Sequence, residues 1–170
     1  MHILKEGTLF ILIFLAALED LRTYKVNNNL IALGFLLGLF FNISSMGAYG
    51  VVLWFLGGIT PIILLFLLYL FRMIGASDLK VFSIVGCFYG ISFVIQSIII
   101  SFIIGAVISF LVLIQNRNIY SRFFYLFSYL VDSIKNQKIC PYYISSIDGT
   151  KNVIPFIVAI MGGVIYTFAF

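Results

Sequence analysis

Long apolar stretches separated by short polar ones dominate this chain. No charged residue occurs from Val26 to Phe71, a window of 46 residues, or from Val81 to Asn116, a window of 36. A further neutral stretch of 19 residues runs from Asn152 to Phe170. Because a membrane-spanning helix needs about 20 apolar residues, the first two windows each hold two spans and the third holds one.

The N-terminal apolar stretch is shorter. Only Gly7–Leu18 lacks charge there, but counting from Ile3, with Lys5 and Glu6 at the interface, gives about 18 residues, enough for a span. A cleaved signal peptide is the alternative interpretation. The residues that follow, Glu19–Arg22, are not a small-residue cleavage site, so we expect a retained first span.

The pattern therefore predicts an all-α polytopic membrane protein with about six transmembrane helices, forming a single domain over residues 1–170. Turn signals between the fourth and fifth spans are weak and amount to Gly90, Gln96 and Ser97. The expected spans are Ile3–Glu19, Asn29–Ile43, Tyr49–Phe71, Leu79–Ser92, Val94–Gln115 and Val153–Phe170.

The connection between the fifth and sixth spans is too long for a turn. Within it, apolar side chains recur at helical spacing while charged ones fall elsewhere on the helical wheel. This pattern predicts an amphipathic helix on the cytoplasmic surface of the membrane. Its apolar face is formed by Phe123, Phe127, Leu130 and Ile134.

Composition and charge strengthen the membrane interpretation. The chain is 63% hydrophobic and 9% charged, whereas soluble domains carry roughly 25% charged residues. Nine of the ten Lys and Arg residues fall in the first, third and fifth connections. The positive-inside rule then places these connections in the cytoplasm and both termini outside. The net charge of +4 reflects this topology, so we expect the lipid bilayer as a partner and no nucleic acid.

Few residues in the sequence suit metal or disulfide chemistry. Cys87 lies in an expected span, Cys140 lies in a cytoplasmic connection, and His2 is the single histidine. We therefore expect no disulfide, no metal site and no cofactor.

Three of the six acidic residues, Glu19, Asp20 and Asp78, occur where apolar spans meet the cytoplasmic face. By the predicted topology Asp20 closes the first span and Asp78 opens the fourth, so both lie at similar depth. Two carboxylates held together do not both ionise easily; one can activate water while its protonated partner hydrogen-bonds a scissile carbonyl. The structural alternatives are a helix N-cap for Asp78 and an interfacial anchor paired with Arg22 or Lys25 for Asp20.

Three short segments, in order, resemble the type IV prepilin peptidases, which are intramembrane aspartyl proteases with a G-x-G-D motif. "GASDLKVFSIVGCFYG" resembles that motif and the glycines that follow it, "DLRTYKVNN" resembles the first Asp segment, and "VIPFIVAIMGG" resembles a late I-P-F segment. Two departures stand out, because Ser77 replaces the second Gly of the motif and Asn27 replaces a Pro. The matching residues are Gly75, Asp78, Lys80, Gly86, Gly90, Asp20, Arg22, Val26, Asn28, Ile154, Pro155 and Phe156.

The resemblance implies an endopeptidase that cleaves the short basic leader of prepilins or pseudopilins at the cytoplasmic face of the bacterial inner membrane. Such cleavage serves type IV or tight-adherence pilus assembly, or type II secretion. The N-terminal zinc segment of the two-function enzymes is not expected here, so the chain resembles the short, peptidase-only form associated with tight-adherence pili. The implied catalytic residues are Asp20 and Asp78, with supporting roles for Gly75, Ser77, Lys80, Arg22 and Asn28.

Two alternatives remain open from the sequence. An archaeal preflagellin peptidase would use the same mechanism, whereas a non-catalytic membrane scaffold of pilus assembly would not need both carboxylates. The sequence leaves the oligomeric state and the identity of the prepilin undetermined.

Overall fold

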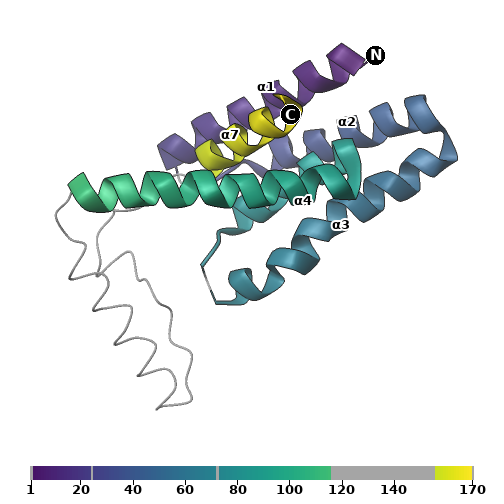
Figure 1. Ribbon diagram of the computed structural model, residues 1–170. Coiled ribbons are helices and arrows are strands. Elements are labelled where there is room, and N and C mark those ends of the chain that lie inside the picture. The colour runs from purple at the N-terminus through teal and green to yellow at the C-terminus, as the bar shows by residue number, and fades with distance from the viewer. Residues whose placement is uncertain (1, 24, 72, 116–155, 170) are drawn as a thin grey trace.

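The computed structural model describes residues 2–23, 25–71, 73–115 and 156–169, and the regular structure in these ranges is helical. Figure 1 shows α1 and α7 side by side above the long helix α4, while α2 and α3 form a hairpin that turns at Gly47. The expected all-α class is thus confirmed for the described residues. The helices are α1 His2–Thr23, α2 Asn28–Met46, α3 Ala48–Leu70, α4 Ala76–Gln115 and α7 Phe156–Ala169.

Helix α4 is interrupted at Gly90, whose φ of 80° and ψ of −170° are not helical. The ring of Phe156 packs against the rings of Phe82 and Phe102, with centroids 6.4 and 5.4 Å away. In a straight helix those two residues would lie about 30 Å apart. The chain must therefore reverse direction at Gly90 (Figure 1).

The opposite end of α7 shows the same arrangement. Phe168 packs against Tyr89, just before the interruption, and against Phe93, just after it, with centroid distances of 4.9 and 4.8 Å. The two halves of α4, residues 76–89 and 91–115, therefore run in opposite directions along α7.

The first half of α4 forms the centre of the bundle. All eight residues from Val81 to Phe88 are buried, beneath α2 and α3 on one side and α7 on the other. Gly86 and Gly57 of α3 let the two backbones touch, since a Cβ on either would overlap the carbonyl of the other. Small residues at such crossings are how helices associate closely in a membrane, where van der Waals packing replaces the hydrophobic effect.

The described residues do not show the expected count of six spans. Helices α2 and α3 and the Ala76–Val112 part of α4 are long and apolar enough to cross a membrane. The expected fourth and fifth spans correspond to the two halves of α4, which run in opposite directions from Gly90. Helix α1 carries five charged residues, and α7 has 14 described residues. The predicted amphipathic helix and the start of the last expected span lie outside the described residues.

Replacing Gly90 by Ala should destabilise the protein through its backbone alone. A Cβ at this position would meet no atom within 4 Å, but the observed φ and ψ are essentially restricted to Gly and cost another residue about 1–3 kcal/mol. We expect Gly90→Ala to lower the free energy of unfolding by that amount, measured by denaturant unfolding in detergent micelles.

Gly7→Ala is the matched control. Gly7 also has open space around it but lies inside α1, where Ala is favoured over Gly by up to about 1 kcal/mol. Equal stability of the Gly90→Ala and Gly7→Ala variants would contradict the assigned reversal.

Candidate active site

Asp20 continues the buried stripe of α1 toward the C-terminal end of the helix. The preceding buried positions recur at intervals of three and four residues, so a side chain four residues after Ala16 faces the same way. Asp20 is accordingly only 5% exposed. The apolar part of the stripe consists of Leu9, Leu12, Ile13, Ala16 and Ala17.

The Asp20 carboxylate lies at the N-terminus of α7, where the backbone N–H of Ile157 donates a hydrogen bond to it. The first four N–H groups of a helix have no partner within the helix. A carboxylate at this positive end is stabilised by the helix dipole as well as by the hydrogen bond. Asp20 therefore links α1 to a helix that begins more than 130 residues later in the chain.

Asp78 is the third residue of α4 and is 7% exposed. Its Oδ2 accepts a hydrogen bond of 3.1 Å from the backbone N–H of Gly75, while the Gly75 carbonyl accepts one of 3.4 Å from Leu79. This is half of a capping box, in which a side chain in the first turn reaches back to the residue that caps the helix. The interpretation of Asp78 as the N-cap residue was therefore wrong, because Gly75 is the N-cap and Asp78 lies three residues further into the helix.

The two carboxylates lie close enough for the charge of Asp20 to act on Asp78. Each is buried and each sits at a helix N-terminus, Asp20 at that of α7 and Asp78 at that of α4. Burial and mutual repulsion disfavour two ionised carboxylates, whereas the helix ends favour one negative charge. Such a pair can share a proton and act as general base and general acid. We call Asp20 and Asp78 the carboxylate pair.

Lys80 and Asn28 join the segments around the carboxylate pair. The Lys80 Nζ donates a hydrogen bond of 2.7 Å to Asn28 Oδ1, although 52 residues separate them. Both side chains are exposed, at the start of α4 and the start of α2. These two predicted supporting residues therefore hold two helix starts together.

Glu19, the acidic neighbour of Asp20, has a different environment. Its Oε2 accepts a hydrogen bond of 2.7 Å from the backbone N–H of Asn27, and the Asn27 side chain accepts one of 3.0 Å from Asn29 N–H, capping α2. A Pro at position 27 would lack the N–H that binds Glu19. Asn27, which stands where the family has Pro, thus caps α2, and Glu19 binds the backbone N–H of Asn27. We did not predict either role.

The other predicted supporting residues occupy distinct positions. A Cβ on Gly75 would lie 3.2 Å from Asp78 Oδ2, so Gly leaves room for this carboxylate. Ser77 is half-buried within the first turn of α4, where a residue other than Gly is readily accommodated. Arg22 is exposed in the last turn of α1, where a cation complements the negative helix end.

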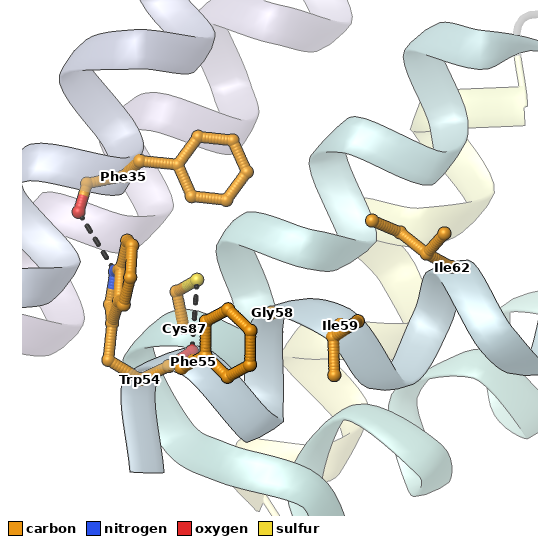
Figure 2. Close-up of a pocket in the computed structure, with 7 residues that line it drawn as sticks. All are labelled: Phe35, Trp54, Phe55, Gly58, Ile59, Ile62 and Cys87. Carbon is orange, nitrogen blue, oxygen red and sulfur yellow. Dashed lines mark hydrogen bonds between the residues drawn. The ribbon is translucent and has the colours of Figure 1, made fainter. Parts of the chain in front are cut away.

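A pocket of about 260 Å³ lies between α2, α3 and α4 (Figure 2), and its lining includes neither residue of the carboxylate pair. Its walls are apolar, and two hydrogen bonds shape it: Trp54 Nε1 donates to Phe35 O at 3.0 Å, and Cys87 Sγ donates to Trp54 O at 3.4 Å. Within the described ranges no three His, Cys, Asp or Glu side chains gather as a metal site would require. The pocket is lined by Phe35, Trp54, Phe55, Gly58, Ile59, Ile62 and Cys87.

Cross-linking can test whether the carboxylate pair is assembled in the membrane. In a background with Cys87→Ser and Cys140→Ser, we expect the Asp20→Cys, Asp78→Cys double variant to be joined by the shortest bifunctional thiol reagents. The product would be detected by mass spectrometry of the digested protein. The control is Glu19→Cys with Asp78→Cys, because residue 19 points about 100° away from residue 20 around α1. Equal cross-linking in both double variants would contradict the observed geometry.

Comparison with known proteins places the chain in a family. The sequence profile of the type IV leader peptidase family matches residues 7–110, more than half of the chain. The match contains both carboxylates and ends before the late I-P-F segment. No curated protein and no solved structure matches the chain. The expected family relationship is therefore confirmed, and the chain belongs to the type IV leader peptidase family.

Proposed function

We propose that the protein is an aspartic-type endopeptidase of the membrane, in which Asp20 and Asp78 jointly activate water. The observation that carries the proposal is the carboxylate pair itself. Two buried carboxylates from distant segments lie within electrostatic reach of each other, each at a helix N-terminus. Burying both would be costly for a structural role alone, and membership of a peptidase family supports a catalytic one.

The proposed reaction needs one proton shared by the pair. The ionised carboxylate takes a proton from water as the water oxygen attacks the scissile carbonyl carbon, and the protonated carboxyl donates to the carbonyl oxygen. As the C–N bond of the tetrahedral intermediate breaks, the leaving nitrogen receives a proton from the pair, and one hydroxyl of the intermediate returns its proton to the pair. The products are a new carboxyl group and a new amino group, and the pair again holds one proton.

The charges around the pair support a cytoplasmic location. Arg22, Lys25 and Lys80 are all exposed at the ends of helices that bear or adjoin the two carboxylates. Lys and Arg concentrate on the cytoplasmic side of membrane proteins. We therefore propose that the pair faces the cytoplasm at the inner membrane of a bacterium, with the chain crossing that membrane several times.

The proposed substrates are prepilins or pseudopilins whose short leader lies in the cytoplasm and precedes a hydrophobic helix. A site at the end of the bundle suits such a substrate, because the scissile bond would stand at the membrane surface while the helix stays in the lipid. Removal of the leader would then allow pilus assembly or type II secretion.

Loss of either carboxylate should abolish cleavage. We expect Asp20→Asn and Asp78→Asn each to lower leader cleavage of a co-expressed candidate prepilin by at least about 100-fold, the usual contribution of a general acid or base. Accumulation of mature pilin on immunoblots, normalised to folded enzyme, measures the effect.

Glu19→Gln is the matched control for these substitutions. A Gln oxygen can still accept from the Asn27 N–H, so this variant should cleave at close to the normal rate. Full cleavage by either Asn variant would contradict the proposal. Full pilus assembly without any cleavage would instead favour a scaffold role.

The replacement of the motif's second Gly by Ser77 leads to a further prediction. Because residue 77 is helical, restoring the Gly of the family motif changes neither Asp78 nor its Gly75 partner. We expect Ser77→Gly to keep or raise the cleavage rate, at a stability cost of up to about 1 kcal/mol. A folded but inactive Ser77→Gly protein would show that the serine side chain itself is needed.

A further inference from the structure

A second polar group of residues lies at the end of the bundle opposite the carboxylate pair. Lys5 precedes Asp20 by 15 residues on α1, a distance of about 22 Å along the helix, and Tyr89 follows Asp78 by 11 residues, about 16 Å. Near Lys5 the structure has a cavity of about 310 Å³, which we call the Lys5 cavity. It is lined by Lys5, Phe41, Asn42, Ser45, Met46, Leu53, Phe88, Tyr89 and Gly90.

The buried Asn42 side chain organises this cavity. Its Nδ2 donates to the carbonyls of Gly38 and Cys87, at 2.8 and 2.6 Å. The Cys87 carbonyl needs such a donor because the interruption at Gly90 disturbs the helical hydrogen bonds that follow it. With Nδ2 engaged in this way, Oδ1 accepts from Lys5 Nζ at 3.4 Å.

The half-buried Lys5 side chain therefore lies in the cavity, where its ammonium group makes two weak interactions. The hydrogen bond to Asn42 is long, and the second contact is the face of the Tyr89 ring, 5.0 Å from Nζ. An ammonium group has three donors and gains most from a charged acceptor. Glu6 is the acidic residue nearby, and its charge acts on Tyr89.

The remaining walls are apolar and come from Phe41, Met46, Leu53 and Phe88, with the Ser45 hydroxyl at the rim. A small inorganic anion would leave these walls unused. A ligand with a phosphate group and an apolar stem would use both the ammonium and the walls.

We propose that the Lys5 cavity binds the phosphodiester headgroup region of a phospholipid from the leaflet opposite the carboxylate pair, with the phosphate at Lys5 and the glycerol and upper acyl chain along the apolar walls. A hydrocarbon core is about 30 Å thick. A lysine about 22 Å from the carboxylates, with a long flexible stem, can therefore reach the far headgroup region. This lipid would also brace the reversal at Gly90, which forms part of the cavity. The proposal does not depend on the proposed peptidase activity.

Lipid-dependent stability and native mass spectrometry test the proposal on the purified full-length protein. We expect phosphatidylethanolamine or phosphatidylglycerol, added to delipidated protein in micelles, to raise Tm by about 3 °C or more, and inorganic phosphate to leave it unchanged. In Lys5→Gln the rise should disappear and the retained lipid should fall about tenfold, the factor expected for one charge-assisted hydrogen bond. Lys5→Arg should restore both.

Two further variants separate a lipid site from a structural lysine. Lys25→Gln makes the same charge change at an exposed position outside the cavity and should keep the lipid response. Ser45→Phe fills the rim and removes the hydrogen bond of 3.2 Å from Ser45 Oγ to the Asn42 carbonyl, but it keeps the Lys5 and Asn42 side chains, and it should lose the lipid response. The proposal is overturned if Lys5→Gln lowers Tm but keeps the full lipid response, or if inorganic phosphate alone reproduces the stabilisation.

Discussion

The close contact between α3 and the first half of α4 is the constraint on which the rest of the structure depends. Gly57 and Gly86 bring the two backbones together, and the residues on either side of Gly86 are buried as a result. A helix fixed in this way at the centre of the bundle holds its own N-terminus in place. Asp78, two turns before Gly86, is therefore positioned by the packing of the core rather than by a loop.

The candidate site then arises where helix ends meet. The Gly75 cap directs one carboxylate oxygen of Asp78, and the first turn of α7 receives Asp20. Aromatic packing of Phe156 against both halves of α4 keeps α7 in register with the helix that carries Asp78. The site thus combines segments from the beginning, middle and end of the chain, and the reversal at Gly90 is what allows one short helix to contact both halves.

The sequence predicted the residues of the candidate site more accurately than it predicted the architecture. Asp20 and Asp78 were recognisable because charge is rare at the edge of an apolar stretch and because both fall in segments that resemble the family's Asp motifs. The structure adds the reason that Asp20 rather than Glu19 faces inward, since Asp20 continues the buried stripe of α1. The helix bonded to Asp20 was not predictable, because no local pattern relates Asp20 to Ile157. The exact point of reversal in α4 was also not predictable, since hydropathy does not reveal where one apolar window of 36 residues divides.

The central claim is that the two carboxylates act as one unit, and a double-mutant cycle on cleavage kinetics tests it most directly. Purified wild type, Asp20→Asn, Asp78→Asn and the double variant would be compared by kcat/KM on one prepilin in one detergent. Because groups that act together lose their function together, we expect the double variant to be no slower than the slower single variant. If the losses of transition-state stabilisation in the two single variants simply added in the double variant, as they do for independent sites, the result would contradict the account.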